Sequence, residues 1–223
     1  MKRVRLITAA FGDDTKELVI AAPLIYKDYE IDVIYYNNDN TRSRENSLNP
    51  RLKGKIPKMM DWLNFPGYDY YIWLDATFTI HEDFLAHMFR YEGQADLFLF
   101  KHPKRSSIKA EFDYIHAKIE NWFTYWIQRY RGELIREQVE IYLADKNFID
   151  DQLFSCGCFM FTNDLIKNLD YNVMKDWFLH NVLYSVQDQL SLPYLLYKHQ
   201  VRYLVYPENI MNSSYLKHDF FLG

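Results

Sequence analysis

The stretch that decides the fold is YIWLDATFTI, residues 71–80, in which an apolar run ends abruptly at an acidic residue. The run from Tyr70 to Leu74 has the unbroken apolar character of a strand that is buried on both faces. Asp75 follows it directly, and residues 76–80 resume a β-prone pattern. A carboxylate at the end of a buried strand is costly unless a partner charge or a metal meets it. Asp75 is therefore either a turn residue that caps the next segment or a metal ligand under a phosphate group.

On both sides of this stretch, segments whose apolar residues are spaced as in strands alternate with segments whose apolar residues are spaced as in helices. Strands are expected at residues 4–11, 31–36, 70–74, 95–101, 153–162 and, as the last one, 201–206. Helices are expected at residues 15–26, 57–63, 109–145 with a break at Gly132, and over most of 164–200, whereas residues 41–55 read as a basic loop. Such alternation predicts a single α/β domain with a mostly parallel central sheet and helices on both faces.

Composition and short motifs exclude several classes of function. The 223-residue chain has 26 basic and 30 acidic residues, and its net charge of −4 argues against a nucleic-acid partner. Neither a Gly-x-Gly-x-x-Gly nor a Gly-Lys-[Ser/Thr] segment occurs, so dinucleotide and P-loop sites are not expected. The 19 Tyr, 16 Phe and 5 Trp residues suit either an aromatic core or a sugar-binding site, where rings stack on sugar faces.

The cysteines and the hydropathy of the chain bear on its compartment. Cys156 and Cys158 are expected on the same face of a strand, too close for a good disulfide and too few for a cysteine metal site. This usage fits a reducing, cytoplasmic compartment. The N-terminus lacks the apolar core of a signal peptide, and no run of about 18 apolar residues predicts a transmembrane segment.

Five blocks occur in an order that is typical of one family. They are ITAAFGD (7–13), YEIDVIYYNND (29–39), KIPKMMDWLNFPGYDYYIWLDATFTI (55–80), FKHPKRSSIKAEFDYI (100–115) and SVQDQLSLPYLL (185–196). In this order, over roughly residues 4–200, they resemble a glycosyltransferase-like family of plants and bacteria that was long described as a domain of unknown function. The chain departs from the family at Thr77, where a second Asp would complete Asp-x-Asp, and at Gln187, where the family often has Arg.

The resemblance implies the GT-A fold of nucleotide-sugar transferases, which small viral and bacterial transferases share. It implies a metal-dependent, inverting transfer of a sugar from a nucleotide donor, most simply UDP-linked, to a saccharide or glycoprotein acceptor. Residues 1–100 would then form the nucleotide-binding half, with the nucleotide near Thr8, Ala10 and Asp39, and residues 101–223 the acceptor side. The alternative is a non-catalytic module that binds a nucleotide sugar or a carbohydrate. A hydrolase is a weaker reading, because no close pair of catalytic carboxylates is evident.

The phosphates of such a donor need cations. Asp75 would hold Mn²⁺ or Mg²⁺, which prefer oxygen ligands and neutralise the leaving diphosphate. Because Thr77 is a poor replacement for Asp, His218 is expected as the second metal ligand. Within the basic segment at residues 42–58, Arg51 and Lys58 are expected to contact phosphate, and the other basic residues to be solvated.

Three further residues complete the predicted site, each with a structural alternative. His102 follows a strand and would bind a sugar hydroxyl or the diphosphate, unless it only packs at the strand end. Gly157 lies within a strand, which indicates either close approach of a ligand or packing against a helix. Asp188 is the candidate general base for the acceptor hydroxyl, with Asp151 as a competitor. In the alternative, Ser185 caps a helix in which Asp188 occupies the favourable acidic position.

Overall fold

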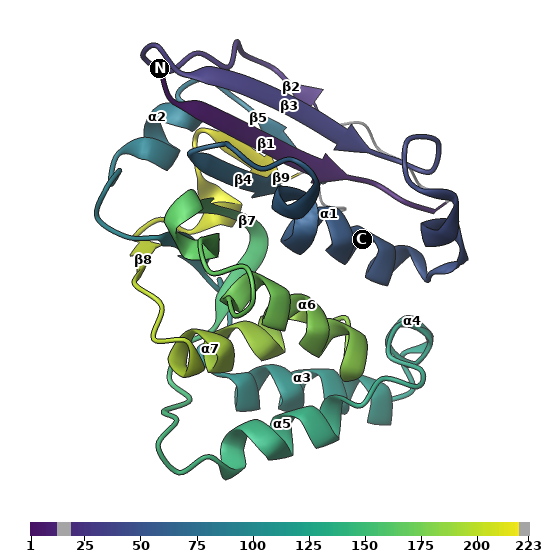
Figure 1. The fold of residues 1–223 in the computed structure, drawn as a ribbon. Coiled ribbons are helices and arrows are strands. Elements are labelled where there is room, and N and C mark those ends of the chain that lie inside the picture. The colour runs from purple at the N-terminus through teal and green to yellow at the C-terminus, as the bar shows by residue number, and fades with distance from the viewer. Residues whose placement is uncertain (13–18, 219–223) are drawn as a thin grey trace.

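The computed structural model describes residues 1–12 and 19–218, and a six-stranded sheet in the order β3-β1-β4-β7-β6-β8 forms its centre (Figure 1). The strands are β1 (Arg3–Ala9), β3 (Glu30–Tyr36), β4 (Tyr70–Leu74), β6 (Leu97–Lys101), β7 (Phe154–Thr162) and β8 (Tyr203–Tyr206). The pairs β1–β3, β1–β4 and β6–β8 are parallel, whereas β7 runs antiparallel to both β4 and β6. The predicted α/β fold with a mostly parallel central sheet is therefore confirmed.

A small second sheet covers one face of the central sheet. It consists of β2 (Val19–Ile20), β5 (Phe78–Ile80) and β9 (Leu216–His218), in the order β2-β5-β9, and it is accompanied by the short helix α2 (Phe84–Phe89). The expectation of helices on both faces is thus only partly right, and β9 follows the strand that was predicted to be last. The helix predicted at residues 15–26 is wrong over its described part, since β2 pairs there with β5 and Ala21 N–H donates to the Ile80 carbonyl at 2.8 Å.

Helices cover the opposite face in two layers. The first layer is α1 (Pro50–Asn64), α6 (Val173–Leu183) and α7 (Asp188–Lys198), and the second is α3 (Ile108–Glu120), α4 (Thr124–Arg129) and α5 (Ile135–Ala144). Figure 1 shows α3 and α5 below α7, away from the sheet. Short 3₁₀ turns occur at η1 (Ser43–Ser47), η2 (Asn163–Ile166) and η3 (Ile210–Asn212). Within the described ranges, no helix is long and apolar enough to cross a membrane.

Helix α1 begins seven residues before the predicted start at Pro57. Its first residue is Pro50, whose missing N–H costs nothing at that position, and the Asn49 side chain caps the helix by accepting a hydrogen bond from Arg51 N–H at 2.9 Å. Pro57 lies inside the helix, where packing of Met59 and Trp62 against the sheet outweighs the lost backbone hydrogen bond. Much of the expected basic loop is therefore helical, and its cations acquire helical spacing.

The middle of β7 is irregular where it meets β6. The partner of Phe98 is Met160, but the partner of Phe100 is Ser155, so several β7 residues around Gly157 bulge from the ladder. Because of this bulge, Cys156 packs into the core on the helical side, whereas Cys158 packs on the side of the small sheet. The prediction that both thiols share one face is wrong for this reason.

Candidate active site

A polar pocket of about 310 Å³ opens at the carboxyl ends of β1 and β4, where ligands bind in open α/β sheets. The starts of α1 and α7 and the bulge of β7 form its other walls. Four cationic side chains and two carboxylates line it: Arg51, Lys55, Lys58, Arg129, Asp75 and Asp188. Although the whole chain is acidic, the formal charge of this pocket is positive by two, so it favours an anionic ligand.

Three of these cations come from one face of α1. Arg51, Lys55 and Lys58 are spaced by four and three residues, which places them on the same side of a helix. Lys55 was not among the predicted site residues, because the basic residues of this segment other than Arg51 and Lys58 were expected to be solvated. The i, i+4, i+7 spacing within a helix that starts at Pro50 was the sequence signal that would have identified it.

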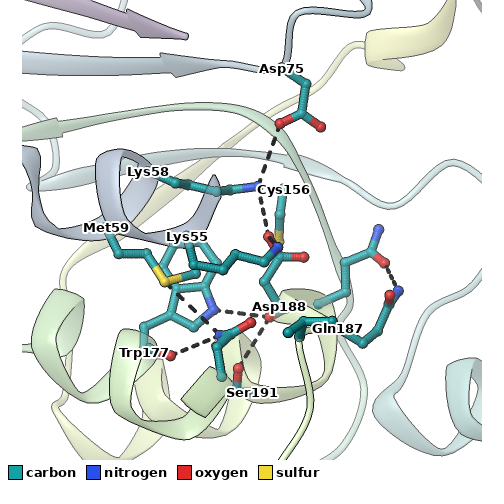
Figure 2. A network of polar contacts seen from close by, with 12 residues as sticks. Lys55, Lys58, Met59, Asp75, Cys156, Trp177, Gln187, Asp188 and Ser191 are labelled. Carbon is teal, nitrogen blue, oxygen red and sulfur yellow. Dashed lines mark hydrogen bonds and ion pairs between the residues drawn. The ribbon is translucent and has the colours of Figure 1, made fainter. Parts of the chain in front are cut away.

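Two of these cations, Lys55 and Lys58, meet one carboxylate, that of Asp188, as Figure 2 shows. Lys55 Nζ and Lys58 Nζ each lie 2.7 Å from Asp188 Oδ2, and the three side chains are almost fully buried. Asp188 is the first residue of α7, and Trp177 Nε1 donates to its backbone carbonyl at 3.0 Å, which fixes this end of the helix. Sequence reasoning placed Asp188 in the site but did not identify its partners.

The capping alternative is wrong for Ser185 but right in placing Asp188 among the acidic first-turn positions of α7. Gln187 occupies the N-cap position of α7 and makes no side-chain capping hydrogen bond. Ser185, the expected cap, instead donates to Gln138 Oε1 on α5 at 2.6 Å. The structural role of Asp188 is to be the counter-ion of the two lysines.

This buried triad fixes the protonation states of its members. Burial alone would raise the pKa of Asp188, but Lys55 and Lys58 outweigh burial and hold that pKa well below its usual range. Burial opposes the charged form of Lys58, yet Asp188 and Asp75 raise its pKa. Burial and the neighbouring Lys58 lower the pKa of Lys55. Asp188 is consequently an ionised carboxylate that binds protons very weakly in this arrangement.

Asp75 lies directly after β4, at the rim of the pocket. Trp73 Nε1 donates to its Oδ1 at 2.6 Å, and Lys58 Nζ lies 3.6 Å from the same oxygen. The Asp75 side chain nevertheless remains 41% exposed, so it can be reached by a ligand. Its backbone N–H donates to the Gly157 carbonyl at 2.7 Å, which ties the end of β4 to the bulge of β7.

Gly157 is required here by close packing. A Cβ at this position would lie 2.9 Å from Phe78 Cε2 and 3.3 Å from Asp75 Oδ2. The absence of a side chain therefore lets the bulge approach Asp75. The alternative of packing against a helix does not describe this contact, since Phe78 belongs to β5, and contact of Gly157 with a ligand stays a prediction.

The small sheet places His218 beside Thr77, two positions after Asp75 in the chain. His218 on β9 pairs with Phe78 on β5, and its Nε2 lies 3.4 Å from Thr77 Oγ1. Two atoms at this separation can bind one divalent ion, whose neighbouring ligands lie roughly 3 Å apart at bond lengths of about 2.1 Å. Within the described ranges, no group of three or more His, Cys, Asp and Glu side chains is arranged around a common metal position. The local donors are thus Asp75, Thr77 and His218.

Several predicted site residues do not line the pocket. Thr8 is completely buried within β1, so the expectation that its side chain meets the nucleotide is not supported. Ala10 and Asp39 lie just beyond the ends of β1 and β3 and do not line the pocket. Their place in the lining is taken by Ala9 and Phe11. Asp151, the competitor of Asp188, lines a separate cavity.

His102 also lies outside the pocket lining. Its Nδ1 accepts hydrogen bonds from the backbone N–H groups of Arg105, at 2.9 Å, and Lys104, at 3.2 Å, which closes the turn after β6. Burial, and then the charge of Arg105, lower the pKa of His102 to about 4. The packed, neutral histidine that was the alternative interpretation describes this environment best.

Arg129 joins the site from a distant segment. Arg51 Nη1 donates to the Arg129 carbonyl at 2.6 Å, and the Arg51 guanidinium lies 5.2 Å from the ring of Tyr130. Tyr130 in turn donates to Gln187 Oε1 at 2.6 Å, beside Asp188. Sequence reasoning missed Arg129, and no local pattern in the chain would have found it, because the contact joins α4 to α1.

Comparisons with solved structures concern the fold. A glycosyltransferase involved in the glycosylation of the major capsid of PBCV-1 aligns over 91% of this chain and 81% of its own, at 11% identity and a TM-score of 0.44. The apo structure of the bifunctional glycosyltransferase WbbM aligns over 92% of this chain and 39% of its own, at 11% identity and a TM-score of 0.50. At such identity the WbbM likeness concerns the fold alone, and this chain spans well under half of that protein.

Sequence comparisons are more specific. A search of curated proteins gave no match. The family model of the TOD1/MUCI70 glycosyltransferase-like domain matches residues 43–214, which is most of the chain and includes α1, Asp75 and Asp188. The resemblance inferred from the ordered sequence blocks is thereby confirmed, and the chain belongs to the TOD1/MUCI70 family of glycosyltransferase-like domains.

Proposed function

We propose that this protein transfers a sugar from a nucleotide-diphosphate donor, most simply a UDP-sugar, to a saccharide or glycoprotein acceptor. The observation that carries the proposal is the pocket at the carboxyl ends of β1 and β4, which is lined by Arg51, Lys55 and Lys58 together with Asp75. Its excess of positive charge suits a diphosphate, and the family of the chain is glycosyltransferase-like.

Lys55 and Lys58 would bind the donor's diphosphate. Both ammonium groups now have Asp188 as their anion, at 2.7 Å, and a diphosphate in the pocket would compete for them. Fixed cations aimed at the leaving group stabilise the charge that develops there as the sugar–phosphate bond breaks.

Asp188 is proposed as the acceptor-side base, in line with an inverting reaction. While both lysines are ion-paired with it, the Asp188 carboxylate is too weakly basic for this role. Movement of the lysines to the diphosphate would weaken the two ion pairs and raise the pKa of Asp188. In this scheme the base becomes available only when the donor is bound. The anomeric configuration of the product, read by NMR, tests the inverting outcome.

A divalent cation, Mn²⁺ or Mg²⁺, is proposed beside Asp75. The donor set fits, because Asp75 is exposed and Thr77 Oγ1 lies 3.4 Å from His218 Nε2 on the adjoining strand. When bound, the ion would supply charge neutralisation to the diphosphate. Asp75, Thr77 and His218 would hold it, and calorimetric titration with Mn²⁺ alone, on wild type and His218→Ala, measures this without an activity assay. Equal Mn²⁺ affinity in both proteins would remove His218 from the site.

A non-catalytic module that binds a nucleotide sugar is the second candidate. The observation that favours it is the ion-paired state of Asp188, which leaves the pocket able to bind an anion without an active base. Turnover separates the two functions. Wild-type protein is incubated with UDP-, GDP- and dTDP-sugars, with Mn²⁺ or with EDTA, and release of the nucleotide is followed. If the protein binds a donor but releases no nucleotide with each of the saccharide acceptors tested, the binding module would be favoured.

A further inference from the structure

Three aromatic side chains are exposed together where α3 leads into α4. Trp122 is 83% exposed, Phe123 49% and Tyr125 59%, within four consecutive positions. We call these three residues the aromatic patch. Large rings exposed as a group are unusual on a protein surface and indicate a binding surface.

The backbone holds this patch in place at an energetic cost. Trp122 has φ +59°, in the left-handed region, at the position after the α3 cap where glycine is the usual residue. Its N–H donates to the Ile119 carbonyl at 3.1 Å, and the Phe123 N–H donates to the Lys118 carbonyl at 3.2 Å, which together form a Schellman ending. A tryptophan at this position adds strain and places its indole in solvent, which structural capping alone would not require.

One member of the aromatic patch, Tyr125, contacts a residue of the candidate active site. Tyr125 OH accepts a hydrogen bond from Arg129 Nη1 at 2.8 Å, and Arg129 lines the pocket. Figure 1 shows α4 close to the end of α1 at which Arg51 lies. Behind the patch, Trp126 is packed edge-on against Tyr114 and Tyr125, with ring centroids 5.4 and 5.8 Å apart, so the surface is supported from below.

We propose that the aromatic patch binds the saccharide acceptor by stacking on its sugar rings. The inference rests on the proposed function, because it gives the acceptor a surface that leads to the pocket where the donor would bind. A sugar ring has an apolar C–H face and a polar rim. The rings of Trp122 and Tyr125 suit that face, and Arg129 together with the Tyr125 hydroxyl supplies polar contacts for the rim. A lipid surface or a second copy of the chain would not need the polar connection to the pocket.

The test compares wild type, Trp122→Gly and Leu179→Ala. Glycine is the preferred residue at a left-handed position, so Trp122→Gly removes the indole without a cost to folding. Leu179 is 48% exposed on α6 and serves as a matched control for loss of an exposed apolar side chain. Each protein is applied to an array of neutral and acidic oligosaccharides, and its UDP affinity is measured by titration calorimetry. Trp122→Gly is expected to weaken retention of oligosaccharides by roughly 3–10-fold, with UDP affinity unchanged.

Other outcomes overturn the proposal. If Trp122→Gly and wild type retain the same oligosaccharides equally well, the patch does not bind the acceptor. The proposal is also contradicted if wild type retains none of the oligosaccharides. A Trp122→Gly variant that loses binding to phosphatidylserine vesicles, or becomes monomeric from a dimeric wild type, while it retains oligosaccharides would assign the patch to a membrane or to a second copy. A wild type that binds oligosaccharides through Trp122 but binds no nucleotide would support the acceptor surface and contradict the proposed function.

Discussion

Removal of the central carboxylate by Asp188→Asn should leave two buried lysines without their counter-ion. The asparagine side chain would keep the shape of the carboxylate but not its charge, and Lys55 Nζ and Lys58 Nζ would face each other across a neutral amide. Asp75 would remain near Lys58, at 3.6 Å, and would offset part of that loss. The variant is therefore expected to be folded but clearly destabilised.

The size of the loss follows from burial. The side chains of Lys55, Lys58 and Asp188 are only 13%, 5% and 10% exposed, so solvent screens them little. Removing one partner of a buried ion pair costs about 3–5 kcal/mol, because the remaining charge is left unpaired. For a protein of this size, that corresponds to a fall in Tm of roughly 6–20 °C.

The pH dependence has a defined sign. Because the pKa of Asp188 is lower in the folded than in the unfolded state, its contribution to stability is full above the unfolded value, about 3.9, and is lost as the pH falls toward the folded value. The stability gap between wild type and Asp188→Asn should thus be constant from about pH 5 to pH 8 and should narrow below about pH 4.

Chemical unfolding of wild type, Asp188→Asn, Lys55→Met and the double variant measures the effect. The double variant should recover part of the loss, because it removes one of the two unpaired cations. In transfer assays, Asp188→Asn should reduce turnover by roughly 10²–10⁴-fold with UDP still bound, as expected for loss of a general base. A destabilisation below about 1 kcal/mol, or additive effects in the double variant, would refute the reasoning that the triad is a coupled buried ion cluster.

Three further predictions concern Gly157, His102 and Lys55. Gly157→Ala should lower the free energy of unfolding by about 1–3 kcal/mol in thermal unfolding and weaken UDP binding, because its Cβ would press on Phe78 and Asp75. The control Gly54→Ala should be tolerated, because its Cβ would meet nothing closer than 3.9 Å. Equal stabilities of the two variants would contradict the close packing at Gly157. The pKa of His102 is lowered to about 4 in the folded protein, so protonation of this side chain favours the unfolded state. The free energy of unfolding of wild type should therefore fall by up to about 3 kcal/mol between pH 6.5 and pH 4. In urea unfolding, His102→Asn should show a smaller fall over the same interval. Lys55→Met should weaken UDP binding in calorimetry by roughly 10-fold or more, since Lys55 would contact the diphosphate, and unchanged affinity would leave the lysine with a structural role only.

Local sequence patterns were sufficient for the strands of the central sheet and for part of the site, but not for β2 and β9 of the small sheet. The alternation of strands and helices predicted a mostly parallel sheet, and the apolar run ending at Asp75 and the glycine in the strand expected at residues 153–162 identified Asp75 and Gly157. These features depend on neighbours in sequence, namely alternation of burial and the end of a buried strand. Asp188 was placed in the site by the resemblance of its sequence block to the family. The start of α1 was missed because Pro57 was interpreted as a first residue, and Lys55 was missed because it was expected to be solvated.

The sequence by itself determined that Arg51, Lys55 and Lys58 share one face of a helix and that Asp75 ends a buried strand, because spacing within one element is a local property. Tertiary structure alone decided which charges meet: Asp188 is 133 positions along the chain from Lys55, and only the packing of the helices brings the start of α7 to the lysines of α1. Tertiary structure likewise joined Arg129 to Arg51, placed His218 beside Thr77, and enclosed Thr8 and His102. Pairing across the fold depends on long-range packing of apolar surfaces, which no local pattern of residues encodes.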